Sequence, residues 1–561
     1  MEIANEDLQT KVLDHHGLVA AMCKELKIAE RIDARLGNGA PRRVVSPGQS
    51  VVAMIINGLG FTNRRLYLTD QFFESKPINR LLDAPEIEAK DITDYTLAHT
   101  LDEISAYGPS KLYGGVAFEV AIENDLLSTV NHLDTTSFST EGEYDVEEKE
   151  NVIKVTHGFS KDHRPDLKQV VLSLVTNGPG AMPVWMDALD GNSSDKKSFH
   201  ETIKRVETFK QQMNTDKNFK WVADSALYTK AGLLKDNTYL WLTRVPETIS
   251  EARALVEVDD SQIDWIDADK GYKTAAFFRN YGDIEQRWLL VFSEQAYARE
   301  KKTFDKKLEK LQEALKKKLW HLGSEKFNCA DDANKAMTAI IISKDAKFFD
   351  VTVTVKPILK YEKKGRPGPE DKQIATGYVV ETSIERNVER INTYLNRKGR
   401  FVLATNDLDE KEYGNEKMLN EYKEQQDVEQ GFKFLKDPWF MVDSIFLKTP
   451  SRIQGLMVVM TLCLMVYNLM QYKLRQKLKE TDDTLPNQLG KEVKNPTVRW
   501  IFQIMEGIGL VRFFQDDLST PIKECICNLN ILRKKIIRLF GDIACWMYGL
   551  NEKNHSEILE M

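Results

Sequence analysis

Three acidic residues stand out because of where the sequence places them. Asp134 lies inside the strand-like segment HLDTTSF, where a carboxylate between apolar neighbours is costly unless it has a partner or a function. Asp224 ends a second strand-like segment, FKWVAD, and Glu429 lies in a helical segment that begins near Glu416. Taken singly, each could be an ordinary surface or capping carboxylate. As a set, three carboxylates with no His or Cys among them suit a hard divalent cation such as Mg²⁺.

The segment around Glu429 gathers polar groups on one side of the expected helix. At about 100° per residue, its polar members fall close together, whereas Val428, Phe432 and Leu435 form an adjoining apolar stripe. The polar members are Tyr422, Gln425, Glu429, Lys433 and Lys436. The pattern predicts one helix face that carries a carboxylate, a phenol and ammonium groups. An ordinary amphipathic surface helix would show the same periodicity.

The elements between the three acids follow a regular order. From residue 126 the sequence predicts a strand with Asp134, a hairpin, a helix and the strand that ends at Asp224. The pattern is interrupted over residues 246–395 and resumes with the strand RFVLATN and the helix of Glu429. We therefore expect residues 126–245 and 396–475 to form one α/β domain, with 246–395 inserted into it. The lysine-rich helix REKKTFDKKLEKLQEALKKKLW in this insertion could be a plain solvated face.

The two ends of the chain are expected to be helical. Residues 1–125 contain short helical segments, and Ser46-Pro47 is typical of a helix start, with a capping Ser before a Pro in the first turn. Residues 476–561 also have helical character, interrupted by Pro486, Pro496 and Pro521. A chain of 561 residues is too long for one core, so three or four domains are expected.

Composition and targeting signals narrow the class of protein. The N-terminus MEIANEDLQT has no basic, apolar leader, and the six scattered cysteines match no zinc spacing or disulfide framework. Both features favour a cytoplasmic protein with reduced thiols. The formal net charge of -7 argues mildly against nucleic-acid binding, although local basic patches are hidden in such a sum.

One uncharged stretch is long enough to cross a membrane. It is IQGLMVVMTLCLMVYNLMQY, between Arg452 and Lys473. Its polar residues recur at offsets that form one stripe of a helix, namely Gln454, Thr461, Asn468 and Gln471. We interpret the stretch as a core helix packed against polar partners, with a membrane segment as the alternative.

These motifs together resemble the DDE transposases of bacterial insertion sequences, in the group named for a Tyr/Arg/Glu/Lys signature. That signature, Y-x2-R-x3-E-x6-K, is matched by Tyr422, Glu429 and Lys436, whereas Gln425 stands in place of the arginine. The resemblance extends through HLDTTSFS, HGFSKDHRPDLKQ, GNSSDKKSF, WVADSALYT, FVLATNDL and the apolar stretch after Arg452, over most of residues 15–550. It implies a ribonuclease-H-like catalytic domain, interrupted by a largely β insertion between the second Asp and the Glu.

The resemblance also implies an activity and a site. Asp134, Asp224 and Glu429 would be the catalytic metal ligands for two Mg²⁺ ions, with Mn²⁺ as a possible substitute. Two such ions activate the attacking oxygen and stabilise the leaving oxygen in phosphodiester chemistry. The reaction would be cleavage at the element's ends followed by strand transfer, by a homodimer on DNA in the bacterial nucleoid. The DNA partners would be the terminal inverted repeats and a target duplex, with residues 1–125 as a DNA-binding domain.

Several residues are expected to contact DNA phosphates. On the signature helix these are Tyr422, Gln425, Lys433 and Lys436, and in the basic segment KKGRPG they are Lys364 and Arg366, which resemble minor-groove arms. A basic turn would explain KKGRPG equally well. The segment HGFSKDHRPD, with His157, Asp162, His163 and Asp166, is interpreted as a structural or DNA-contacting loop, with a second metal site as the alternative. Two other functions stay open: a related metal-dependent nuclease and a non-catalytic DNA-binding derivative.

Overall fold

We analysed a computed structural model of the chain. It describes residues 8–37, 43–61, 68–144, 150–213, 218–229, 232–233, 238–362, 368, 372–437, 440, 447–514, 521 and 523–550. The chain divides into two compact units, one formed by Met1–Leu242 with Leu419–Met561 and the other by Thr243–Met418. The predicted insertion, residues 246–395, falls within the second unit. The other predicted domains all contribute to the first unit, and the division among them stays a prediction.

The first unit is built around a sheet in the order β4-β3-β2-β5. Strands β2 (Val130–Thr140), β3 (Lys168–Asn177) and β4 (Met182–Leu189) are antiparallel neighbours, whereas β5 (Lys220–Ala223) runs parallel to β2. The β2 to β5 connection includes helix α8 (Asp195–Gln212), which packs on β2 and β3 and begins after Ser194. This succession of a hairpin, a helix and a parallel strand agrees with the predicted order of elements.

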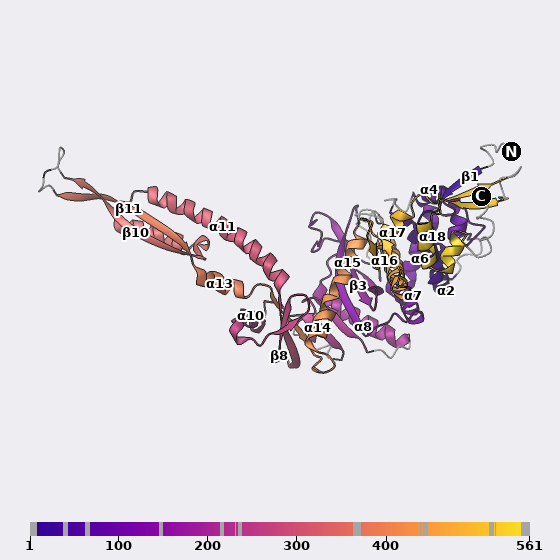
Figure 1. The fold of residues 1–561 in the computed structure, drawn as a ribbon, viewed down its shortest axis with the longest axis horizontal. Coiled ribbons are helices and arrows are strands. Elements are labelled where there is room, and N and C mark those ends of the chain that lie inside the picture. The colour runs from indigo at the N-terminus through magenta and orange to yellow at the C-terminus, as the bar shows by residue number, and fades with distance from the viewer. Residues whose placement is uncertain are drawn as a thin grey trace. The chain divides into compact units, whose positions relative to one another are not determined.

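Helices α15 and α16 also pack on this sheet, and Figure 1 shows both near β3. Helix α15 (Gln425–Leu435) packs on β2, β3 and α16, and α16 (Pro450–Glu480) packs on β4. Gly431 allows the close approach, because a Cβ there would lie 3.1 Å from Leu464 of α16. The segment before α15 forms a separate helix, α14 (Asn415–Lys423), and the two are separated at Glu424. The helix predicted from about Glu416 is therefore present from Asn415, but it is interrupted at Glu424.

Helix α16 is the apolar stretch that the sequence offered as a possible membrane segment. It is the one helix within the described residues that is long and apolar enough to span a bilayer, and 89% of its most apolar window is buried inside the protein. The polar stripe is packed as predicted: Gln454 accepts a hydrogen bond from Ser105 and donates to the Asn151 carbonyl. Asn468 donates to the Ala181 carbonyl at 3.0 Å. These contacts support the interpretation of a core helix.

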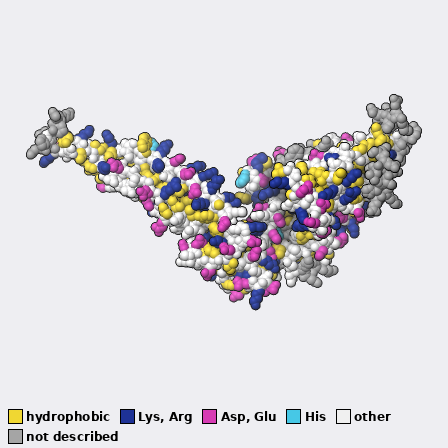
Figure 2. Space-filling model, viewed as in Figure 1, with side chains coloured by type: hydrophobic (Ala, Val, Ile, Leu, Met, Phe, Trp, Pro, Cys, Tyr) yellow, Lys and Arg dark blue, Asp and Glu magenta, His cyan; other side chains and the backbone are white. Residues whose placement is uncertain are grey.

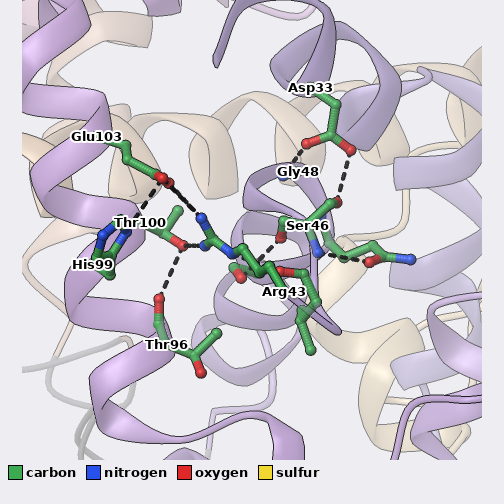
Figure 3. A network of polar contacts seen from close by, with 11 residues as sticks. Asp33, Arg43, Ser46, Gly48, Thr96, His99, Thr100 and Glu103 are labelled. Atoms are coloured by element: carbon green, nitrogen blue, oxygen red, sulfur yellow. Dashed lines mark hydrogen bonds and ion pairs between the residues drawn. The ribbon is translucent and has the colours of Figure 1, made fainter. Parts of the chain in front are cut away.

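The N-terminal part of the first unit is helical, as predicted, and polar contacts fix its helices. Its helices are α1 (His16–Glu25), α2 (Ile28–Leu36), α3 (Pro47–Gly58), α4 (Thr69–Glu74), α5 (Ile78–Leu81), α6 (Asp94–Tyr107) and α7 (Pro109–Glu123). Ser46 caps α3, with a reciprocal bond from its backbone N–H to Gln49. Figure 3 shows the Arg43 guanidinium between Thr100 and Glu103 of α6, to both of which it donates. The same view shows Asp33 of α2 accepting from Ser46 and from the Gly48 amide, so α2, α3 and α6 are tied together.

The C-terminal part is less helical than predicted. It contains α17 (Val498–Ile504), α18 (Ile531–Leu539) and α19 (Asp542–Met547), together with the strands β13 (Leu485–Pro486), β14 (Glu492–Val493), β15 (Gly509–Phe513) and β16 (Lys523–Cys527). Strand β15 pairs with β16 and with β1 (Leu8–Val12), so the two ends of the sequence share a three-stranded sheet. The helical character predicted for residues 476–561 is therefore found only in part, because short strands paired with a distant segment leave little periodic signal. All six cysteines are described, and all are free.

The second unit combines strands and long helices. Its strand order β12-β9-β8-β7 joins β12 (Arg400–Thr405), β9 (Ile284–Ser293), β8 (Tyr272–Tyr281) and β7 (Ile266–Ala268). The hairpin of β10 (Phe349–Tyr361) and β11 (Gln373–Arg386) packs against α11 (Glu294–Ser324) and α12 (Ala330–Ile341). The remaining helices are α10 (Ser250–Glu257) and α13 (Val388–Asn396), and β6 (Leu240–Arg244) spans the boundary between the units. The expected largely β insertion is therefore corrected to a mixed unit.

Helix α11 is the lysine-rich helix of the sequence, and its charged side chains face solvent. Lys and Arg side chains lie along this part of the surface in Figure 2. Phe304, Leu308, Leu315 and Leu319 are buried on the opposite side of the helix, in a cluster with Phe348 of the same unit. The interpretation of α11 as an amphipathic helix with a solvated charged face is confirmed.

Candidate active site

Asp134 and Asp224 lie on neighbouring parallel strands at equivalent positions. In the β2–β5 pairing Leu133 is opposite Ala223. Asp134 is the next residue of β2, and Asp224 directly follows the end of β5. Because paired residues of parallel strands point to the same face, the two carboxylates lie on one face of the sheet, on neighbouring strands. The two carboxylates are close enough that Asp224 raises the pKa of Asp134. The sequence prediction that these two acids converge is consistent with this placement.

The surroundings of Asp134 disfavour its ionised form. Burial is the main cause that raises the pKa of its carboxyl to about 7; the carboxylates of Asp224 and Asp195 also raise this pKa, whereas Lys161 and the Thr135 backbone N–H lower it. One carboxylate oxygen accepts a hydrogen bond from the Thr135 backbone N–H at 2.7 Å. A cation bound nearby would stabilise the ionised form of this buried carboxyl and lower its pKa.

Asp224 is in a similar environment. Burial is also the main cause that raises the pKa of this carboxyl, and Asp195 raises it as well. The Ala226 backbone N–H donates to its Oδ1 at 2.9 Å, which orients the carboxylate at the turn after β5 and lowers the pKa in part. Both aspartates are thus close-set carboxylates that are destabilised by burial and by like charge.

Two further residues join the pair, and the sequence reasoning did not single them out. Asp195, the first residue of α8, accepts a hydrogen bond from the Thr135 hydroxyl. The Lys161 Nζ lies 3.3 Å from Asp195 and 3.9 Å from Asp134. Both residues belong to segments of the transposase resemblance, HGFSKDHRPDLKQ and GNSSDKKSF, which was the only sign of their importance.

Glu429 is not joined to the aspartates by any polar contact within the part of the chain that the structure describes. It lies on α15 with its side chain exposed to solvent. Among the described residues, no group of three or more His, Cys, Asp or Glu side chains is arranged so that it could hold a metal ion. The structure therefore brings together two of the three predicted acids, and it does not assemble the predicted three-acid site.

Gln425 does not occupy the position expected of a phosphate contact. Its side chain is 8% exposed, and its Nε2 donates to the Leu133 carbonyl of β2 at 2.9 Å. The expectation that this amide faces DNA is wrong, because Gln425 begins α15 on the side that packs against the sheet. Its role in the structure is to anchor the helix of Glu429 to the strand of Asp134.

The other predicted DNA contacts fall in several places. Tyr422 lies on α14 and is half-buried, so it does not share one continuous helix with Glu429. Lys433 is exposed on α15 and, with Arg475 and Lys479, lines a cavity of about 760 Å³. Lys436 ends α15 and forms an ion pair with Asp162 at 2.6 Å. Lys364 and Arg366 lie outside the described residues.

The segment HGFSKDHRPD is a loop, as interpreted, rather than a metal site. Asp162 pairs with Lys436, and Asp166 pairs with Arg164 at 2.8 Å. These carboxylates serve different cations, so they and the two histidines do not form one ligand set within the described residues. The loop instead places Lys161 beside Asp134 and Asp195, and it places Asp162 in contact with Lys436 at the end of α15.

A family described as "Domain of unknown function (DUF4277)" matches residues 8–118, which is well under half of the chain. No curated protein matches the chain. A structure described as "Cryo-EM structure of piggyBac transposase synaptic complex with hairpin DNA (SNHP)" is 9% identical, with a TM-score of 0.35 over 87% of this chain and 80% of that one. Another, "Mos1 transposase paired-end complex with left transposon end", is 10% identical, with a TM-score of 0.14 over 36% and 60%. Likenesses at these scores carry no argument about fold or function.

Proposed function

We propose that the protein is a DDE-type DNA transposase, which cleaves DNA at the ends of a mobile element and joins them to a target. The observation that carries the proposal is the placement of Asp134 and Asp224 on the parallel neighbours β2 and β5. With the antiparallel β3 and β4, this gives the order of elements expected of a ribonuclease-H-like catalytic domain. The signature residues Tyr422, Glu429 and Lys436 follow in the chain at the spacing of the transposase group.

The donor atoms at the site fit a divalent cation in their chemistry. Asp134 and Asp224 supply hard carboxylate oxygens, which Mg²⁺ and Mn²⁺ prefer, and Asp224 lies close enough to raise the pKa of Asp134. Asp134 and Asp224 would hold the metal, with Glu429 as the third ligand that the resemblance implies. When bound, Mg²⁺ would supply an activated nucleophile and charge relief at the phosphate.

The chain's own residues would position DNA and the acids. Gln425 fixes α15 to β2, and the ion pair of Lys436 with Asp162 fixes the other end of α15 to the loop of Lys161. Exposed Lys433 would contact phosphates, which supply most of the affinity in such complexes. The proposed partners are the inverted repeats at the element's ends and a target duplex, bound by a homodimer.

Cleavage and joining of end DNA test this proposal. The DNA that flanks the gene serves as substrate, with Mg²⁺ added to the purified full-length chain. We expect Asp134→Asn, Asp224→Asn and Glu429→Ala each to abolish cleavage and to leave end binding largely intact, whereas Glu416→Ala, an exposed glutamate on α14, retains activity. Undiminished cleavage by Asp134→Asn would refute the assignment of the site. Cleavage without any joined product would instead identify a metal-dependent nuclease.

A further inference from the structure

Lys161 places a positive charge inside the acidic site. Its ammonium nitrogen donates to the Thr135 carbonyl at 2.6 Å and to the Thr135 hydroxyl at 3.0 Å. The same nitrogen lies 3.3 Å from a carboxylate oxygen of Asp195 and 3.9 Å from one of Asp134. Lys161 also interacts with Asp224, where it opposes the rise in pKa caused by burial. The Lys161 ammonium therefore interacts electrostatically with three carboxylates.

The loop that carries Lys161 is held in place on both sides. The Lys161 backbone N–H donates to the Ser137 hydroxyl of β2 at 3.0 Å, so the main chain is attached to the strand of Asp134. The next residue, Asp162, is paired with Lys436 at the end of α15. Because both neighbouring contacts are polar and the Lys161 side chain is 34% exposed, the ammonium can leave the carboxylates without disturbing a hydrophobic core.

The charges at the site explain why a cation is needed. Asp134 lies within β2, Asp224 directly follows β5 and Asp195 begins α8, and one ammonium relieves the repulsion among these three carboxylates only in part. A divalent ion bound to Asp134 and Asp224 would neutralise the same carboxylates and would therefore compete with the Lys161 ammonium. An ammonium ion and a divalent cation repel each other strongly at contact distances in a partly buried site.

We propose that Lys161 is a resident cation that occupies the acidic site before metal binding and is displaced from Asp134 and Asp195 when a divalent ion binds. The inference rests on the proposed function in one respect, namely that Asp134 and Asp224 hold the metal. Lys161 thereby acts as a positioning residue: it keeps three carboxylates together in the metal-free protein and lowers the affinity for the first ion. Before metal binding, the Lys161 ammonium nitrogen lies 3.3 Å from the carboxylate of Asp195.

Metal binding to variants of the full-length chain tests the displacement. Mn²⁺ binding is followed through the loss of the free-ion signal in electron paramagnetic resonance, without DNA. Lys161→Gln should bind Mn²⁺ roughly tenfold more tightly than the wild type, since the competing ammonium is gone. The matched control is Lys196→Gln, which removes the same charge from an exposed lysine beside Asp195 and should change the affinity much less. Equal or weaker binding by Lys161→Gln relative to this control would overturn the proposal.

A second measurement uses the wild-type protein and therefore does not depend on a variant that folds. An amine-acylating reagent is applied with and without saturating Mn²⁺, and the modified lysines are quantified by mass spectrometry. Lys161 should react slowly without metal and several-fold faster with it, whereas the exposed Lys196 reacts at one rate throughout. Unchanged reactivity of Lys161 in the presence of bound Mn²⁺ would show that the ammonium stays in place and would refute the displacement.

One more variant separates failure of this inference from failure of the proposed function. If Asp134→Asn binds Mn²⁺ as well as the wild type does, the metal site itself is misplaced, and the transposase proposal loses its basis. If Asp134→Asn abolishes Mn²⁺ binding while Lys161→Gln leaves it unchanged, only the displacement is wrong. A Lys161→Gln variant with unchanged Mn²⁺ affinity and weakened DNA binding would identify Lys161 as a phosphate contact instead.

Discussion

The amide nitrogen of Gln425 donates to the carbonyl oxygen of Leu133 at 2.9 Å, one residue before Asp134 in β2. This hydrogen bond ties the helix of one predicted catalytic residue to the strand of another. It also explains how a glutamine can stand where related signatures have an arginine: at this position the side chain is buried against the sheet, where a neutral amide costs less to desolvate than a guanidinium. Gln425 thus holds the start of α15 against β2.

Replacing Gln425 with a charged residue should destabilise the protein. Gln425→Arg would bury a guanidinium next to β2, and we expect a loss of about 2 kcal/mol or more in the free energy of unfolding, without tighter DNA binding. Gln426→Arg, the same change at the exposed neighbouring position, should stay within about 0.5 kcal/mol of the wild type. Urea unfolding measures both. Two equally stable variants would show that the Gln425 side chain is free to leave the sheet.

The raised pKa of Asp134 predicts a pH dependence of stability in the metal-free protein. The carboxyl has a folded-state pKa of about 7 because of burial, whereas it ionises near pH 4 in an unfolded chain. The folded state therefore binds more protons between these values, and stability falls as pH rises through this window. Relative to Asp134→Asn, which does not titrate, the wild type should lose about 3 kcal/mol between pH 4 and pH 8 in EDTA. A difference that is constant with pH would contradict the assigned environment.

The ion pair between Lys436 and Asp162 predicts opposite effects on DNA binding. If Lys436 contacts phosphate once it is released from Asp162, Lys436→Gln should weaken end binding and lower the salt slope by about one. Asp162→Asn should strengthen binding, because it frees the ammonium. Both variants should lose less than about 1 kcal/mol of stability, since the pair is partly exposed. Titrations at several salt concentrations measure the slope, and identical slopes for the two variants would exclude Lys436 as a phosphate contact.

The buried position of α16 predicts that a charge in its polar stripe prevents folding. Thr461 is 0% exposed and donates to the Met457 carbonyl, so Thr461→Asp would bury an unpaired carboxylate at a cost of several kcal/mol. Gln476→Asp, at an exposed position of the same helix, should be tolerated. Circular dichroism and soluble yield without detergent distinguish the two variants. A folded Thr461→Asp protein would show that α16 does not form part of this core.

The residues that sequence reasoning placed correctly are those fixed by local pattern. Asp134 and Asp224 were found because a carboxylate within or directly after an apolar strand is unusual, and parallel strands then bring such positions together. The packed polar stripe of α16 followed from the spacing of Gln454 and Asn468. In each case the sequence pattern lies within a single strand or helix, so it can be recognised without knowledge of contacts between distant segments.

The residues that were missed depend on contacts between distant segments. Lys161 reaches the site from a loop that is held by Ser137, and nothing in the loop's own periodicity predicts that direction. Similarly, the buried position of Gln425 depends on the packing of α15 against β2, which the periodicity of the helix alone does not predict. The strands β15 and β16 were missed because short segments that pair with each other and with β1 have no helical or alternating pattern of their own.

The pairing of the two ends of the sequence has a consequence for how the protein is made. The Tyr548 hydroxyl donates to the Asp14 carbonyl, 534 positions earlier, and β1 pairs with β15. At about 5–20 residues per second, a ribosome needs about 30–100 s to synthesise the intervening chain. The N-terminal strand must wait that long for its partner, so a nascent or truncated chain cannot complete this sheet. Any activity that requires the sheet would be confined to chains whose synthesis has passed Cys527, the last residue of β16.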